Sequence, residues 1–319
     1  MDSVDSRPTV NAQKPLQEAI RQLVRGSWAD IESSLVTYGE PTTLTDTQST
    51  VRCHFLRSNA NGDPRLQTLV EQLADQIIDY CIPRKEIEAI EKLPQNRKST
   101  KYAHLYREST GLFTQTQVTT GEGAELLLYV LLEKGLQVPQ ILNKMSLKTS
   151  TEMQYHGADG VHAKFLDNGD LAVYWGEAKL YESVSQAMTS CMNSIAPYLT
   201  GSAYEQDLFL IRHHADTGNS EITAQLLEYF DNGSILSANV EMRGACLIGF
   251  AHKDYPSLRR DEDMTKVKEE LDSALNRWAD SMRERLMDRS LTKYTIEVFF
   301  IPLPSVEDFR QAIKQELRI

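Results

Sequence analysis

The sequence predicts an α/β fold. Short apolar segments of strand length alternate along the chain with segments of helical periodicity. Near the middle, the hairpin-turn signal Asp167-Asn168-Gly169-Asp170 separates two such strand segments. Upstream of it, residues 126–132 are apolar all round, which is typical of a helix buried against other elements. Together these observations predict a sheet that is covered by helices.

Length and composition limit the class of protein. The chain has 319 residues and a hydrophobic fraction of 41%, which suits one large domain or a domain with an elaborated second part. The sequence contains no apolar stretch of membrane-spanning length, and residues 1–8 lack the features of a signal peptide. We therefore expect a cytoplasmic protein that makes no membrane contact. The four cysteines are scattered, which argues against structural zinc and disulfides and predicts buried thiols.

Residues 1–118 predict an N-terminal elaboration of helices with one strand, a candidate partner-binding part. Its expected elements are a helix within 16–36, a strand at 50–56, helices at 65–81 and 85–93, and a mostly irregular basic segment at 94–118.

Residues 119–319 are predicted to form the core of the α/β fold together with C-terminal strands and helices. Its expected elements are a helix at 119–132, a connector or strand at 140–147, a hairpin of 156–166 with 171–180, a helix at 181–196 ended by Pro197, strands at 208–211 and 243–251, a helix at 264–287, a strand at 294–301 and a helix at 306–317. Helix, antiparallel hairpin, helix and strand is the order of a restriction-endonuclease-like core. We therefore expect a central mixed sheet flanked by helices, with N- and C-terminal elaborations.

Glu125 lies in the predicted buried helix without an evident structural role. Thr119 and Glu122 have the spacing of a capping box, whereas Glu125 lies one turn deeper among apolar neighbours. A buried carboxylate is costly unless it is paired, protonated or bound to a metal. The alternative is an exposed residue at the helix start, where the helix dipole favours an acid. We assign Glu125 to the candidate site.

Glu177 and Lys179 are two residues apart in a predicted strand, so their side chains share one face. The alternative is an exposed ion pair at a strand end, which contributes only ~0–1 kcal/mol. By itself this Glu-x-Lys pattern is a weak motif.

Asp159 joins this pair only in one hairpin register. A three-residue turn with Gly169 in the left-handed conformation places Asp159 opposite Glu177. A two-residue Asn-Gly turn places it opposite Ala178, facing the other way. The sequence allows both, and we adopt the first as the hypothesis. Two carboxylates and a lysine gathered there can hold a divalent metal beside an ammonium, the minimal set for phosphodiester hydrolysis.

Other polar residues have competing interpretations. His162 is interpreted as structural, and His213 and His214 as surface residues at a strand end. Solvated side chains are favoured over phosphate contacts for Lys144 and Lys148, while contact with the site and solvation are equally plausible for Gln186. The sequence lacks a Walker phosphate loop, a dinucleotide-binding Gly-x-Gly-x-x-Gly and a Gly-x-Ser-x-Gly nucleophile elbow.

The net charge of −11 is unusual for a protein that grips nucleic acid unaided, because phosphate neutralisation requires a basic surface. Residues 84–107 depart from this balance, with seven Lys or Arg against three Glu. This segment is either a solvated surface or a phosphate-contacting patch.

Three segments resemble a known nuclease pattern. They are Gly121-x-x-x-Glu125-Leu126-Leu127-Leu128-Tyr129-x-Leu131-Leu132-Glu133, Gly157-x-Asp159-Gly160-Val161-His162 and Trp175-Gly176-Glu177-Ala178-Lys179-Leu180-Tyr181. Over about residues 119–200 the chain resembles the PD-(D/E)xK nuclease superfamily and, more narrowly, the HamA family of bacterial Hachiman anti-phage defence systems. One departure is Ala158, where the superfamily often has a proline.

The resemblance implies a Mg²⁺-dependent DNA nuclease, in which Mn²⁺ can substitute, that forms a heterodimer with a superfamily 2 helicase (HamB-like). It implies that the nuclease is held inactive until infection disturbs DNA. Its catalytic residues would be Glu125, Asp159, Glu177 and Lys179, with metal ligands from Asp159, Glu177, Glu125 and the carbonyl of Ala178. The acidic charge fits a nuclease whose partner supplies DNA. The alternatives are a catalytically inert restriction-fold module that regulates a helicase, and an RNase with the same site.

Overall fold

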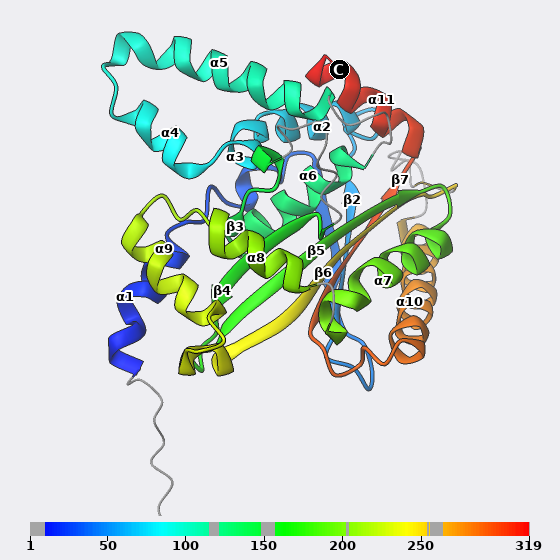
Figure 1. Ribbon diagram of the computed structural model, residues 1–319. Coiled ribbons are helices and arrows are strands. Elements are labelled where there is room, and N and C mark those ends of the chain that lie inside the picture. The colour runs from blue at the N-terminus through cyan, green and yellow to red at the C-terminus, as the bar shows by residue number, and fades with distance from the viewer. Residues whose placement is uncertain are drawn as a thin grey trace, which may run out of the picture.

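The sheet at the centre of the molecule has seven strands among the residues that the structure describes (Figure 1). The structure is a computed structural model that describes residues 10–114, 121–147, 157–201, 204–253, 255 and 264–318. The strands are β1 (Leu35–Thr43), β2 (Thr50–Leu56), β3 (Gln140–Leu142), β4 (Gly160–Phe165), β5 (Leu171–Tyr181), β6 (Val240–Ala251) and β7 (Ile296–Leu303), in the order β1-β2-β7-β6-β5-β4-β3. The inner strands β2, β7, β6 and β5 are parallel, and antiparallel pairs lie at both edges. The predicted α/β fold with a mixed central sheet is confirmed.

Helices cover both faces of the sheet (Figure 1). One layer contains α1 (Val10–Arg21), α7 (Val184–Thr200), α8 (Tyr204–His214), α9 (Ser220–Leu227) and α10 (Met264–Asp288). The other contains α2 (Leu66–Ala74), α3 (Ile77–Cys81), α4 (Arg84–Glu91), α5 (Gln95–Thr114), α6 (Glu122–Val130) and α11 (Val306–Leu317). A π-helical turn at Leu131–Gly135 extends α6, and 3-10 turns lie at Trp28–Asp30, Met145–Leu147, Glu228–Phe230 and Ile235–Asn239.

Strand periodicity divides the interior into two cores. Along β5, Val173 and Trp175 pack in the core beneath α7, whereas Ala172 and Tyr174 pack in the core beneath α6. Residues 171–178 are all buried, because β5 lies inside the sheet with a helix layer on each side. The four cysteines are buried and free, as predicted.

The hairpin between β4 and β5 adopts the predicted bulged register. Gly169 has a φ of 89°, and its amide donates to the carbonyl of Leu166 at 2.9 Å, which closes a three-residue loop. The ladder then runs from Phe165 opposite Leu171 to Gly160 opposite Gly176. One residue further, this register places Asp159 across from Glu177.

Two sequence-based element assignments are wrong. Residues 94–118 were expected to be mostly irregular, but α5 occupies most of this segment. Its buried residues are sparse, Leu105 and Leu112 among them, so the apolar periodicity of α5 is weak. Residues 208–211 were expected to form a strand but lie within α8. There Leu208 and Ile211 are buried while Phe209 is 59% exposed, which is the i, i+3 pattern of a helix.

Boundaries differ in other places as well. The single helix expected at 65–81 is divided into α2 and α3 by a turn at residues 75–76. The helix expected within 16–36 ends at Arg21, and strand β1 begins at Leu35. Pro197 was expected to end α7, but the helix continues to Thr200, where Gly201 with a φ of 120° provides the left-handed C-cap. Thr119, the predicted capping residue of α6, lies outside the described residues.

Strands β1 and β2 belong to the first 118 residues and extend the same sheet through the parallel pairing of β2 with β7. The division of the chain at residue 118 stays a prediction. None of the described helices combines the length and apolar character needed to cross a bilayer.

Gly169→Ala and Gly111→Ala are expected to change stability in opposite directions. At Gly169 an alanine must adopt the left-handed conformation, which costs roughly 1–2 kcal/mol. Gly111 lies in α5 with open space around a Cβ, so alanine there raises helix propensity and stabilises by up to about 1 kcal/mol. Urea unfolding of both variants measures the two free energies, and a shift in the same direction would contradict this account of the hairpin.

Candidate active site

Polar side chains meet where the hairpin begins, beneath the N-terminal half of α6. Asp159 directly precedes β4, and its amide donates to the carbonyl of Gly176 at 2.8 Å. Its carboxylate Oδ2 accepts the amide of Ala178 at 2.7 Å. On β5, Lys179 Nζ lies 2.5 Å from Glu177 Oε1. The hairpin thus gathers two carboxylates and one ammonium.

Glu177 is held inside the protein. It is 5% exposed, pairs with Lys179 and accepts a hydrogen bond from the side chain of Ser194 on α7. The thiol of Cys191 on the same helix contacts the Glu177 carbonyl at 3.4 Å. The interpretation of Glu-x-Lys as an exposed ion pair is therefore wrong for the glutamate.

Glu125 enters the same region from α6. The hydroxyl of Tyr80 on α3 donates to Glu125 Oε2 at 3.3 Å, and Glu125 and Asp159 line one small depression. The helix approaches the hairpin closely at Gly176, where a Cβ would lie 3.2 Å from Leu128 Cδ2 and 3.3 Å from the Gly160 carbonyl. A side chain at position 176 would therefore require Leu128 or the hairpin to shift by a few tenths of an ångström, so this glycine favours the close approach of α6, which carries Glu125.

The carboxylates are electrostatically under-compensated. Burial raises the pKa of Asp159 well above its usual range, and the charges of Glu125 and Glu177 raise it further. Burial also raises the pKa of Glu177, and the Lys179 ammonium only partly opposes this. Burial disfavours the charged form of Lys179, but Glu177 and Asp159 outweigh it, so the pKa of the ammonium is raised. Shifted carboxylates of this kind are typical of functional sites.

The donor chemistry of the cluster fits a hard divalent cation. Mg²⁺ prefers oxygen ligands, and Glu125, Asp159 and Glu177 supply carboxylate oxygens close enough to influence one another. A cation would also offset the negative charge that raises the pKa values. Within the described parts of the chain, however, no three His, Cys, Asp or Glu side chains are arranged as a ready metal site. In this arrangement the Asp159 carboxylate accepts a hydrogen bond from the Ala178 amide, and the Glu177 carboxylate pairs with Lys179.

His162 has a structural environment. It is 1% exposed, its Nδ1 lies 2.9 Å from the carbonyl of Val138, and its ring neighbours Tyr129. Burial lowers the pKa of His162 to about 4, so the ring is neutral at physiological pH. It lines the same depression as Glu125 and Asp159 without an acid–base role evident in its contacts.

The other predicted polar residues have different outcomes. Lys144 is not solvated, because it forms a buried ion pair with Asp207. Gln186 is exposed on α7. His213 and His214 are exposed as expected, but they end helix α8 and not a strand. Lys148 lies outside the described residues.

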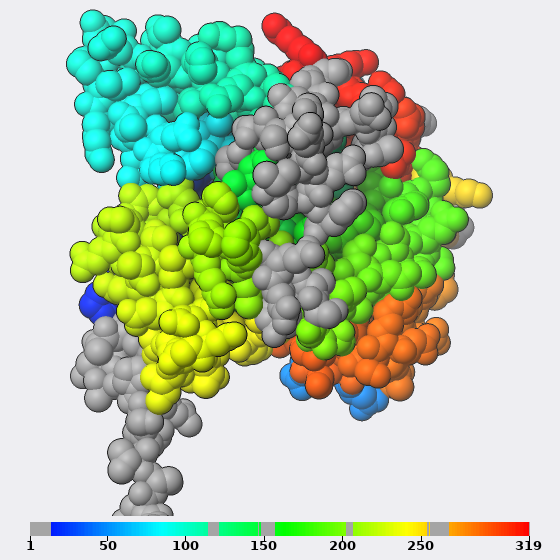
Figure 2. Space-filling view, viewed as in Figure 1, coloured from blue at the N-terminus to red at the C-terminus, as the bar shows by residue number. Residues whose placement is uncertain are grey.

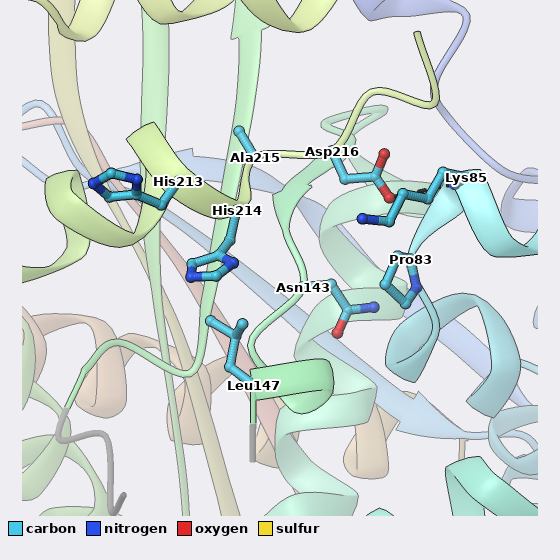
Figure 3. Close-up of a pocket in the computed structure, with 8 residues that line it drawn as sticks. All are labelled: Pro83, Lys85, Asn143, Leu147, His213, His214, Ala215 and Asp216. Atoms are coloured by element: carbon cyan, nitrogen blue, oxygen red, sulfur yellow. Dashed lines mark hydrogen bonds between the residues drawn. The ribbon is translucent and has the colours of Figure 1, made fainter. Parts of the chain in front are cut away.

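A separate polar hollow of about 130 Å³ lies between the end of α8 and the start of α4 (Figure 3). Lys85 and His214 point toward it, whereas His213 points away. The Asp216 carboxylate beside it accepts the amides of Gly218 at 2.9 Å and Lys85 at 3.4 Å. None of the four candidate catalytic residues lines this hollow.

The model of the HamA family matches residues 31–317, nearly the whole chain. The chain belongs to the HamA family. No curated protein matches it. HamA membership associates the chain with Hachiman anti-phage defence, as the sequence resemblance implied, and the match extends well beyond residues 119–200.

Sequence reasoning missed three residues that support the HamA candidate site. They are Tyr80, which contacts Glu125, Ser194, which contacts Glu177, and Asp207, which pairs with Lys144. Tyr80 follows the apolar face of its helix and looks like a core residue. Of the three, only Asp207 has a signal in the sequence, because it is an acid directly before the apolar run 208–211. The structure shows that it is 1% exposed, which is rare for an aspartate without a partner.

Asp159→Asn is expected to stabilise the folded protein at neutral pH. The folded protein holds the Asp159 proton to a higher pH than the unfolded chain, so its stability rises as pH falls from the raised pKa toward the unfolded value near 4. Asparagine removes the charge, keeps an acceptor for the Ala178 amide and lacks this pH dependence. Thermal unfolding at pH 5 and pH 8 should show the larger gain in Tm at pH 8.

The matched control is Asp280→Asn, at an exposed position of α10. It removes the same charge from the surface and should leave Tm nearly unchanged at both pH values. Destabilisation by Asp159→Asn at pH 8 would contradict the conclusion that nearby positive charge only partly offsets the negative charges around Asp159.

Proposed function

We propose that this protein is a divalent-metal-dependent DNA nuclease of a bacterial anti-phage defence system, controlled by a superfamily 2 helicase partner. The observation that carries the proposal is the hairpin register, which sets the buried carboxylates of Asp159 and Glu177 beside Lys179. HamA family membership supports the defence role.

Each residue of the cluster has a role in phosphodiester hydrolysis. Asp159, Glu177, Glu125 and the carbonyl of Ala178 would hold Mg²⁺, or Mn²⁺ in its place. The bound cation would lower the pKa of a water molecule and offset charge on the phosphate. Lys179, kept charged by its raised pKa, orients the attacking water and stabilises the growing negative charge. Tyr80 fixes the orientation of Glu125.

The charge of the chain supports delivery of DNA by a partner. A net charge of −11 gives little intrinsic attraction for phosphates. Helices α4 and α5 form a projecting part of the surface (Figure 2). Lys98 pairs with Glu91 there, and the exposed cations are Lys85, Lys92, Arg97, Lys101 and Arg107. These few cations are too sparse to replace a basic binding surface, so the nuclease would stay inactive until the helicase presents DNA.

A second candidate function is that of a catalytically inert module that regulates the helicase. The observation that favours it is the absence, among the described residues, of a ready group of three metal-binding side chains. The inert module and the nuclease predict opposite results for Mg²⁺-dependent cleavage, and an RNase with the same site would act on RNA in the same assay.

Glu177→Gln and Lys179→Met should each reduce cleavage about 10²–10³-fold or more, because each removes a charge that acts on the transition state. The assay incubates purified protein with plasmid DNA or RNA, in Mg²⁺ or EDTA, with and without the helicase partner. Activity should require Mg²⁺, act on DNA and increase with the partner.

The chain offers a closely matched control. On the adjacent strand β6, Glu241 and Arg243 form a Glu-x-Arg ion pair at 2.8 Å with the same spacing. Glu241→Gln should leave cleavage intact. Full activity of a folded Glu177→Gln protein, or cleavage that persists in EDTA, would refute the proposal.

A further inference from the structure

A buried ion pair lies next to the candidate site, where it contacts the residue that precedes Asp159. Lys144 follows β3, and its Nζ lies 2.9 Å from both carboxylate oxygens of Asp207 on α8. The side chains are 11% and 1% exposed, respectively. Burying two charges is costly, and such a pair is often no more stabilising than apolar residues of the same volume. The pair therefore calls for an explanation other than general stability.

Both side chains form hydrogen bonds with the backbone of one residue, Ala158. Lys144 Nζ donates to the Ala158 carbonyl at 2.6 Å, and Asp207 Oδ2 accepts the Ala158 amide at 3.3 Å. The preceding residue, Gly157, lies so close that a Cβ there would stand 2.4 Å from Lys144 Nζ and 2.7 Å from Asp207 Oδ1. Hydrogen bonds and close packing thus fix the chain on the N-terminal side of Asp159.

On its other side, Asp159 is fixed by the hairpin. Its amide bonds to Gly176, and its carboxylate accepts the Ala178 amide. Because Asp159 lies one residue before the first residue of β4, the ladder alone does not hold its backbone from both directions. The Lys144–Asp207 pair supplies the missing constraint.

We propose that the Lys144–Asp207 ion pair is a positioning device that holds Ala158 so that the Asp159 carboxylate lies where a divalent cation binds. The part that concerns the cation rests on the proposed function. Neither residue touches the reacting atoms, so both act through Asp159. The attachment of α8 has its own apolar basis in Leu208, Leu210 and Ile211, which pack in the core beneath that helix layer.

The first test measures backbone positioning without reference to activity. In Lys144→Met and Asp207→Asn, hydrogen exchange at the Ala178 amide should become about tenfold faster, since Asp159 no longer accepts it reliably. Exchange is followed by NMR or by mass spectrometry of peptides covering 157–160 and 176–179. Unchanged exchange in both folded variants would overturn the proposal.

The matched control is Lys134→Met. Lys134 is buried and also pairs with an aspartate, the exposed Asp30, at 2.5 Å, but it lies in the π-helical turn that extends α6. Losing it should destabilise the protein without changing exchange at Ala178. Equal acceleration in this control would mean that general loosening, and not positioning, explains the effect.

The second test measures cation affinity directly. Mn²⁺ binding, followed by electron paramagnetic resonance, should weaken roughly 10–100-fold in Lys144→Met and Asp207→Asn, as is usual when residues that orient metal ligands are removed. Lys144→Arg keeps a cationic donor and should restore much of the affinity. If the unaltered protein neither binds Mn²⁺ nor cleaves DNA, the proposed function fails, whereas the exchange experiment still decides the positioning role.

A single variant that leaves one buried charge unpaired can fail to fold. The double variant Lys144→Met, Asp207→Leu removes both charges at similar volume and also lacks both hydrogen bonds to Ala158. It should fold, show the faster exchange at Ala178 and bind Mn²⁺ weakly. Exchange and binding equal to those of the unaltered protein would refute the positioning role.

Discussion

The register of the β4–β5 hairpin is the constraint on which the candidate site depends. Side chains alternate between two cores with a period of two, so a slip by one residue would exchange the buried faces of a strand. Gly169, in its left-handed conformation, closes the three-residue loop that sets the register. The two cores above and below β5 then stabilise this register, because Val173 and Trp175 pack in one core while Ala172 and Tyr174 pack in the other.

Burying the carboxylates of Asp159 and Glu177 side by side destabilises the folded protein, and contacts elsewhere in the structure must offset this free-energy cost. Asp159 and Glu177 have raised pKa values because burial and mutual repulsion disfavour their charges. Lys179 and the Ala178 amide offset part of this cost. The two apolar cores offset the rest of this free-energy cost. Functional sites commonly reduce stability locally while the rest of the fold compensates.

Elements distant in sequence complete the arrangement. Helix α6 brings Glu125 to the hairpin because Gly176 permits its close approach, and α3 orients that glutamate through Tyr80. On the opposite side, α8 and the segment after β3 grip Ala158. The site is therefore held by contacts among five parts of the chain, all of which lie within residues 31–317, the range that the HamA family model matches.

The sequence by itself determined the features that local chemistry governs. Strong periodicity located β2, β6, β7, α10 and α11, and the turn residues with the Glu-x-Lys spacing located the hairpin and its polar residues. Only the tertiary structure chose the register, since both turn types suit the same residues. It also decided that residues 208–211 are helical, because a short apolar run takes the conformation its neighbours bury best. The burial of Lys144 against Asp207 likewise depends on a contact across 63 residues, which no local pattern encodes.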